Sequence, residues 1–285
     1  MLDSAKVAAL EFIESQLGDD VLERLDALEV HLGGRETDDF GFSPEHLKWV
    51  LPVAAFFYQR WFRAQSFGLD KLPEGPALFI ANHSGQIPID AAMIVTGLML
   101  EADPPRAPRS MVERLVPSLP YLSVFFSRLG QVLGTPENCR HLLKEGYSVL
   151  AFPEGAGGIS KTYDKAYNLQ EFGHGFMRLA LETKTPIVPV GLVGAEEQYP
   201  TFWNLDSVAK SLGLPAFPVI LNAFIPIIGL LPLPVKYRIY FGTPLYFEGD
   251  PEEDESEIAI KVTQVKESID GLLRRGLDER EGFFR

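Results

Sequence analysis

The sequence predicts an α/β fold in which a mostly parallel sheet is flanked by helices and preceded by an N-terminal helical region. From residue 72 onward, short apolar segments that fit buried strands alternate with segments that fit helices, as in parallel sheets. Before that point, apolar residues recur at helical spacing. The chain has 285 residues, 46% of them hydrophobic, which is enough to bury the core of such a fold.

The N-terminal region, residues 1–69, is predicted to be helical. Residues 4–32 carry apolar side chains at helical spacing and predict two acidic amphipathic helices. Ser43 suits an N-cap and precedes a proline, so a third helix is expected to begin there. Pro52 is expected to kink or interrupt this helix.

Residues 44–66 are rich in aromatic side chains and also hold Arg60 and Arg63. Aromatic rings beside arginine suit a bilayer interface, where the ring lies at headgroup level and the cation meets phosphate. An ordinary buried helix explains the same residues equally well. The segment is therefore either a membrane-contacting helix or part of the core.

Residues 70–247 are predicted to form the α/β domain. Strands are expected at 77–81, 109–113, 131–133, 147–152 and 187–193, an edge strand at 237–241, and helices at 90–100 and 169–183. The window 212–235 is very apolar but holds five prolines. Five prolines argue against a membrane-spanning helix in this window. The window is expected to form either an irregular part of the core or a surface that contacts the acyl chain and the membrane. Residues 248–285 predict a closing amphipathic helix.

The net charge of −13 is distributed unevenly. Residues 1–47 hold 12 acidic and three basic side chains, residues 248–285 hold 12 and six, and the stretch between them holds 15 and 17. A nucleic-acid partner is not expected, because phosphate binding relies on Lys and Arg. The nearly neutral middle remains compatible with an anionic membrane surface and with the phosphates of coenzyme A.

The single cysteine, Cys139, excludes a disulfide framework and a cysteine-rich zinc site and fits a reducing compartment. The histidines show no metal-binding spacing, so no metal is expected. Neither a signal peptide nor a membrane-spanning segment is predicted. These features favour a cytoplasmic location.

One candidate site follows the strand predicted at 77–81. His83 comes directly after this strand, and Asp90 opens the next predicted helix. Ligands in α/β sheets bind beyond the carboxyl ends of strands. A histidine there can take a proton from a hydroxyl, while an aspartate holds its tautomer and stabilises the imidazolium.

A second candidate site follows the strand predicted at 147–152. It reads Phe-Pro-Glu-Gly-Ala-Gly-Gly and contains Glu154, Gly155 and Gly157. Glycines let a backbone approach a ligand closely, and a carboxylate can contact substrate hydroxyls. The segment lacks the Gly-Lys-Ser/Thr of a P-loop and the third glycine of a dinucleotide fingerprint. Taken alone, it fits an ordinary strand-to-helix connector better than a ligand site.

Together these blocks resemble the lysophospholipid/glycerolipid acyltransferase family over roughly residues 70–245. Asn82 to Asp90 is similar to the family's Asn-His…Asp block, residues 152–155 to its Phe-Pro-Glu-Gly block, and residues 186–190 to its closing Val-Pro block. No Gly-x-Ser-x-Gly elbow of a serine hydrolase is present.

The resemblance implies a fatty-acyl transfer from acyl-CoA or acyl-carrier protein to the hydroxyl of a glycerolipid or lysophospholipid. His83 would be the general base and Asp90 its orienting partner, while Glu154, Gly155 and Gly157 would help to bind the acceptor. No cofactor, metal or covalent acyl-enzyme is implied. The expected setting is a peripheral membrane enzyme, with an acyl thioester, a lipid acceptor and a membrane surface as partners.

Two departures from the family pattern stand out. Six residues separate His83 from Asp90, whereas the usual family spacing is four. The longer spacing resembles that of a divergent subgroup. The turn between the two residues must therefore bulge if Asp90 is to reach His83. Two arginines that usually bind phosphate are replaced, one by Pro136 and one in the Ala-Gly after Gly155. Arg140, Lys161 and Lys165 are the candidate substitutes. If none of these three side chains binds a phosphate, the expected acceptor is a neutral lipid alcohol such as a mono- or diacylglycerol.

A second function remains open on the same residues. The stretched turn between His83 and Asp90 also fits a lipid-binding or scaffold protein that keeps the fold without catalysis. The two functions differ in geometry. An Asp90 carboxylate within hydrogen-bond reach of His83 favours the enzyme, whereas an Asp90 turned to solvent favours the binding protein.

Overall fold

The computed structural model describes residues 19–31, 35–83, 89–113, 122–155, 158, 161–204, 218–220 and 231–284. Within these residues, a seven-stranded sheet has the order β1-β9-β6-β2-β5-β3-β4. Its strands are β1 (Gln65–Phe67), β2 (Leu78–Ala81), β3 (Arg109–Val112), β4 (Gln131–Leu133), β5 (Val149–Ala151), β6 (Ile187–Val193) and β9 (Arg238–Phe241). A separate antiparallel pair joins β7 (Thr201–Asn204) and β8 (Pro218–Ile220).

The large sheet is mostly parallel, as the sequence predicts. Strands β6, β2, β5, β3 and β4 are parallel to one another, and β9 runs antiparallel to β6. The prediction that residues 237–241 form an edge strand is wrong, because β9 lies between β6 and β1. Strand β1 occupies the edge and pairs parallel with β9. Strand β1 lies before residue 70, the predicted start of the α/β domain, so the sheet extends across this predicted boundary.

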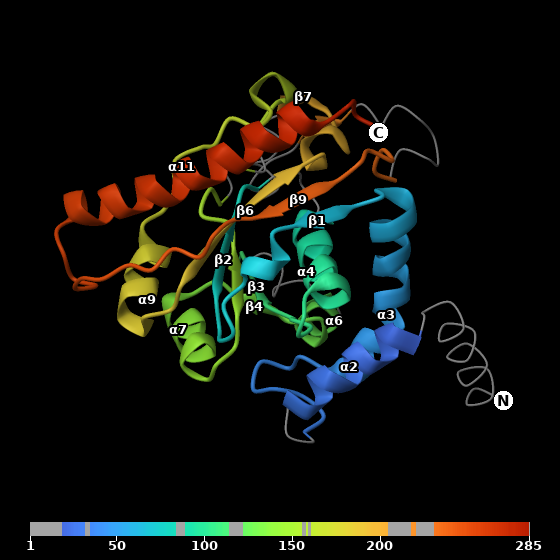
Figure 1. Ribbon diagram of the computed structural model, residues 1–285, viewed down its shortest axis with the longest axis horizontal. Helices are drawn as coiled ribbons and strands as arrows, with labels where there is room; N and C mark the ends of the chain where they lie inside the picture. The colour runs from blue at the N-terminus through green and yellow to red at the C-terminus, as the bar shows by residue number, and fades with distance from the viewer. Residues whose placement is uncertain are drawn as a thin grey trace.

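Helices cover both faces of the sheet (Figure 1). They are α2 (Asp19–His31), α3 (Pro44–Phe56), α4 (Ile89–Glu101), α6 (Leu122–Arg128), α7 (Pro136–Lys144), α9 (Gly175–Thr183) and α11 (Glu255–Glu279). Leu78 and Ile80 of β2 join the core beneath α7, α9 and α11. Phe79 and Ala81 join the core beneath α4. This alternation follows from the two-residue period of a strand.

Helix α3 begins as the sequence predicts and continues past the proline at which a kink or an interruption is expected. The Ser43 hydroxyl accepts the His46 backbone N–H at 3.4 Å, and Pro44 is the first helical residue. The predicted interruption at Pro52 is absent, since the helix runs through it to Phe56. A π-type turn, η1 (Phe57–Trp61), then leads into β1.

Helix α9 begins at Gly175, so the helix predicted over 169–183 starts too early. The residues before Gly175 form other hydrogen bonds. The backbone N–H of Gln170 donates to the Glu154 carboxylate, and the backbone N–H of Gly173 donates to the Pro153 carbonyl. These backbone groups bond to the turn after β5 instead of to a helical ladder. The segment therefore follows the edge of the candidate site.

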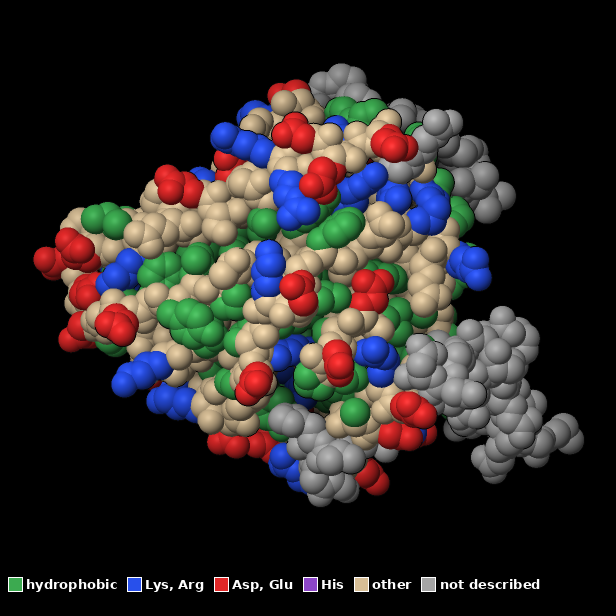
Figure 2. Space-filling view, in the orientation of Figure 1, with side chains coloured by type: hydrophobic (Ala, Val, Ile, Leu, Met, Phe, Trp, Pro, Cys, Tyr) green, Lys and Arg blue, Asp and Glu red, His purple; other side chains and the backbone are tan. Residues whose placement is uncertain are grey.

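Helix α11 confirms the predicted amphipathic C-terminal helix. Its buried side chains recur at helical spacing and pack on β6: Ile258, Val262, Val265, Ile269 and Leu273. Acidic side chains gather over its first turns, at the tip on the left of Figure 2. No helix among the described residues is both long enough and apolar enough to cross a bilayer. The helix predicted over 4–17 and two thirds of the window 212–235 lie outside these residues.

Candidate active site

The two blocks singled out in the sequence meet at the carboxyl edge of the sheet. Strands β2 and β5 are parallel neighbours, with Ile80 opposite Ala151. The residues that follow the two strands, His83 and Glu154, therefore emerge side by side. The backbone N–H of His83 donates to Oε1 of Glu154 at 2.9 Å. Sheet register alone thus brings together residues that are 71 positions apart.

His83 and Asp90 form a hydrogen-bonded pair in spite of the longer spacing between them. Nδ1 of His83 lies 2.7 Å from Oδ2 of Asp90, whose side chain is fully buried in the first turn of α4. Oδ1 of Asp90 accepts the backbone N–H of Ala91 at 2.8 Å. The intervening residues 84–88, and with them the predicted bulge, lie outside the described residues.

This pairing determines which ring nitrogen is available for chemistry. A carboxylate accepts hydrogen bonds, so Nδ1 carries the proton and donates it to Asp90, which leaves the Nε2 lone pair free. The His83 side chain is 17% exposed, while that of Asp90 is inaccessible. The Phe152 ring stacks on the imidazole with centroids 4.4 Å apart. The arrangement can accept a proton from a group that reaches Nε2.

The pKa of His83 is raised above its ordinary value of 6.5. Burial of the ring acts to lower this pKa, because it disfavours the imidazolium. The charge and hydrogen bond of Asp90, together with the charge of Glu154, outweigh burial, although Lys161 opposes them. The result is a stronger base than a histidine in water.

The carboxylate of Glu154 is fully buried, and both of its oxygens are engaged by backbone groups. Oε1 accepts from His83, and Oε2 accepts from Gln170 at 2.9 Å. The Lys161 ammonium lies 3.4 Å from Oε2 and 2.9 Å from the Glu196 carboxylate. Glu154 therefore ties the turn after β2 to the segment before α9. Its predicted contact with the acceptor stays a prediction.

Three supporting residues are not identified by sequence reasoning. The side chain of Asn82 bonds the Leu192 carbonyl at 3.1 Å and the Leu192 N–H at 2.8 Å, which fixes the end of β2 against β6. Phe152 stacks on the His83 ring. At Gly158, an added Cβ would lie 2.7 Å from the Cβ of His83. A polar residue ending a buried strand is the sequence signal for Asn82.

The other predicted site residues lie in different surroundings. Arg140 projects from α7, and its Nε lies 2.7 and 2.8 Å from the two carboxylate oxygens of Glu182. Lys165 is exposed at the end of the short helix η3 (Tyr163–Lys165). Gly155 adopts φ +51°, a left-handed conformation that favours glycine. Gly157 lies outside the described residues.

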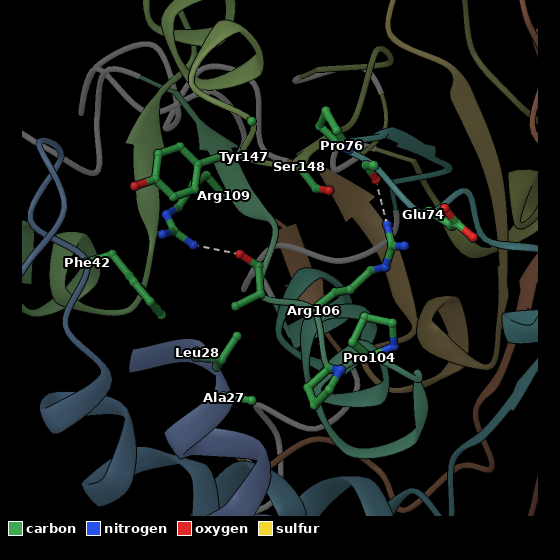
Figure 3. A pocket seen from close by; sticks show the side chains of 14 residues that line it. Ala27, Leu28, Phe42, Glu74, Pro76, Pro104, Arg106, Arg109, Tyr147 and Ser148 are labelled. Atoms are coloured by element: carbon green, nitrogen blue, oxygen red, sulfur yellow. Dashed lines mark hydrogen bonds between the residues drawn. The ribbon is translucent and has the colours of Figure 1, made fainter. Parts of the chain in front are cut away.

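Among the described residues, several cavities lie away from this pair, and two of them adjoin the sheet. One, of about 400 Å³, opens at the amino ends of β2, β3 and β5 and is lined by Arg106 and Arg109 among others (Figure 3). The other, of about 240 Å³, lies between the sheet and helices α7 and α9 and is mostly apolar; burial raises the pKa of Cys139 in its wall to about 11. The described residues contain no cluster of three or more His, Cys, Asp or Glu side chains suited to a metal.

Comparison with known proteins agrees with this geometry. Residues 63–193 match the family model described as Acyltransferase, which includes the His83–Asp90 pair and the turn after β5. An uncharacterized protein of Mycobacterium tuberculosis is 34% identical over 261 residues, covering 88% of this chain and 72% of the relative.

A human protein named DGAT1/2-independent enzyme synthesizing storage lipids is 27% identical over 73% of this chain and 61% of its own length. The crystal structure of the 1-acyl-sn-glycerophosphate acyltransferase from Thermotoga maritima superposes with a TM-score of 0.52, at 19% identity and 82% coverage of each chain. The sheet order, the paired histidine and aspartate and the family match agree with one another. The chain belongs to the same family as the mycobacterial relative, and its residues 63–193 place it among the acyltransferases.

Proposed function

We propose that the protein transfers a fatty acyl group from an acyl thioester, acyl-CoA or acyl-carrier protein, to the hydroxyl of a glycerolipid or lysophospholipid. The observation that carries this proposal is the 2.7 Å contact between Nδ1 of His83 and the buried carboxylate of Asp90. This contact occupies Nδ1 and leaves Nε2 as the nitrogen that can act as a base, at the edge of the sheet where ligands of α/β proteins bind.

In the proposed reaction, Nε2 of His83 takes the proton of the acceptor hydroxyl as its oxygen attacks the thioester carbonyl. Asp90 stabilises the imidazolium that forms, because a buried carboxylate 2.7 Å away interacts strongly with it. The tetrahedral intermediate then expels the thiolate, which takes the proton back from His83. The products are an ester and a free thiol, and only the side chains of the protein and its two substrates take part.

The proposal places this chemistry at a membrane surface. Exposed apolar side chains occur on α3 (Val53 and Phe56) and on α6 (Leu122, Val124 and Phe125). Helices α3 and α6 pack against each other. Exposed apolar residues grouped on adjacent helices mark interaction sites, and their aromatic members suit a lipid interface. The opposite face of α3 is buried, as the core interpretation of residues 44–66 expects, and the membrane contact of the exposed face is part of this proposal.

The test is a transfer assay with radiolabelled oleoyl-CoA and a panel of lipid acceptors in mixed micelles. Replacement of His83 by Ala is expected to reduce transfer by about 10²–10⁴-fold, the usual contribution of a general base. His141→Ala is the matched control, because His141 lies half-exposed on α7 and bonds only at the surface. Near-normal transfer by the His83 variant would overturn the mechanism. Lipid binding by the wild type without any transfer would establish the scaffold alternative.

A further inference from the structure

The acceptor of this reaction is the feature on which the compared proteins differ. One is named for storage lipids and another for an acyl-glycerophosphate. The charged side chains around His83 can distinguish a phosphate-bearing acceptor from a neutral one without reference to the compared proteins. The question is which described residues could receive a phosphate group next to the reacting hydroxyl.

The cations near the carboxyl edge already have carboxylate partners. Lys161 is only 4% exposed and lies between Glu154 and Glu196. Arg280, which follows α11, lies 2.5 Å from the Glu197 carboxylate. These side chains neutralise buried acids of the protein and are not presented to a ligand.

Two candidate cations remain, and one of them, Arg140, already has a carboxylate partner. Arg140 uses its Nε on both oxygens of Glu182, in a contact between α7 and α9. Lys165 lies exposed on η3. Phosphate monoesters are usually held by the guanidinium fork of arginine or by several converging N–H groups. The charges that shift the pKa of His83 come from Asp90, Glu154 and Lys161, and no arginine is among them.

The carboxylates at this edge are more numerous than the cations. Beyond Asp90 and Glu154, Glu196 and Glu197 follow β6 and are buried. Glu113 follows β3, and its Oε1 lies 3.8 Å from the position that a Cβ would take at Gly155. Burial raises the pKa of Glu196, and the charge of Glu154 adds to this shift. A dianionic phosphate placed here would meet like charges in a poorly solvated site.

We propose that the acceptor is an uncharged acylglycerol hydroxyl, of the mono- or diacylglycerol class, and not glycerol phosphate or lysophosphatidate. This inference rests on the proposed acyl transfer and specifies its substrate. A neutral glycerol backbone brings no charge to the carboxylates, and its hydroxyl groups can donate hydrogen bonds to them. The missing family arginines at Pro136 and after Gly155 agree with this assignment.

The test compares acceptors in one assay, with oleoyl-CoA as donor and mono-oleoylglycerol, dioleoylglycerol, lysophosphatidate and glycerol 3-phosphate at matched concentrations in neutral micelles. The expected kcat/KM for the better acylglycerol exceeds that for either phosphate acceptor by at least about tenfold, which corresponds to about 1.4 kcal/mol. Equal or faster transfer to lysophosphatidate overturns this inference alone. Transfer to none of the acceptors overturns the proposed function, and this inference with it.

A charge variant separates electrostatics from shape. Glu113→Gln removes an exposed negative charge next to Gly155 and is expected to raise kcat/KM for lysophosphatidate several-fold relative to that for the acylglycerol. Glu257→Gln is the matched control, since Glu257 is exposed in the first turn of α11, at the end opposite Arg280. An unchanged acceptor ratio in the Glu113 variant would show that charge does not select the acceptor, which also overturns the inference.

Discussion

Oε1 of Glu154 accepts the backbone N–H of His83 at 2.9 Å, while Oε2 accepts the backbone N–H of Gln170 at the same distance. A single buried carboxylate thus fixes the segment that carries the base and the segment that leads into α9. Each backbone N–H would otherwise be left without this acceptor, and an unsatisfied buried donor costs about 1–3 kcal/mol. Glu154 therefore acts as a positioning residue for His83.

Replacement of Glu154 by Gln is expected to lower both stability and kcat. The amide keeps one acceptor oxygen but sets an N–H group against a backbone N–H donor, and it removes a counter-charge from Lys161. We expect a loss of about 2–3 kcal/mol in the free energy of unfolding, measured by urea denaturation. Glu182→Gln is the control, because the ion pairs of Glu182 with Arg140 and Lys144 are partly exposed and contribute under about 1 kcal/mol. Equal losses in the two variants would contradict the positioning role.

The raised pKa of His83 predicts the pH dependence of transfer. The base works only when Nε2 is unprotonated, so kcat/KM falls as the pH drops through this pKa. Because the pKa is raised, the acidic limb is expected above pH 6.5. Replacing Asp90 by Asn removes the charge that raises the pKa, while burial continues to lower it. The acidic limb should then shift to lower pH as kcat falls, in a pH profile of the folded variant. If the acidic limb of the profile stayed at the same pH in the Asp90 variant, the limb would report the ionisation of a group other than His83.

The pairing of His83 with Asp90 was predictable from sequence, but the contacts that support this pair were not. His83 and Asp90 follow a strand and open a helix, and these local patterns depend little on the rest of the chain. The role of Glu154 depends on the register between β2 and β5 and on a segment that sequence periodicity assigned to a helix. Burial of Lys161 between two carboxylates likewise arises from tertiary packing, which composition does not report.

The same distinction holds for the fold. Apolar runs located β2, β5 and β6, because strands buried on both faces of a parallel sheet are mostly apolar. Strand β1, with the sequence Gln-Ser-Phe, has only three residues and follows the π-type turn after α3 without a break in composition. Its pairing partner β9 lies more than 170 residues later in the chain. Missing β1 is what placed β9 at the edge.

Membrane contact is expected to depend on the exposed apolar side chains of α3 and α6. Replacing Phe56 and Phe125 by Ser should reduce the fraction bound to anionic vesicles several-fold in a sedimentation assay, since burial of apolar area contributes about 25 cal/mol per Å². Both rings are about half exposed, so the fold should tolerate the change. Ile260→Ser on α11 is the control, because Ile260 is equally exposed but lies on another helix. A larger loss with Ile260→Ser would assign membrane contact to α11.

The ion pair of Arg109 with Asp38 is expected to be a main determinant of stability at the opposite edge of the sheet. Nε of Arg109 lies 2.7 Å from Oδ2 of Asp38, and both side chains are buried. The Phe42 ring lies 3.9 Å from the guanidinium carbon, and the cavity of Figure 3 opens beside it. Burial lowers the pKa of Arg109, and the charge of Asp38 opposes this effect.

Replacing Asp38 by Ala would leave the Arg109 cation buried without its counter-charge and would also remove the acceptor for the backbone N–H groups of Phe40 and Phe42. The expected loss is about 3–5 kcal/mol in the free energy of unfolding, measured by urea denaturation. The exposed pair of Arg35 with Asp39 is the matched control, and Asp39→Ala should cost under about 1 kcal/mol. The double variant Asp38→Ala with Arg109→Met should be more stable than Asp38→Ala alone, because it removes the unpaired charge. If the double variant were less stable, packing of the guanidinium between Phe42 and Tyr147 would outweigh its charge.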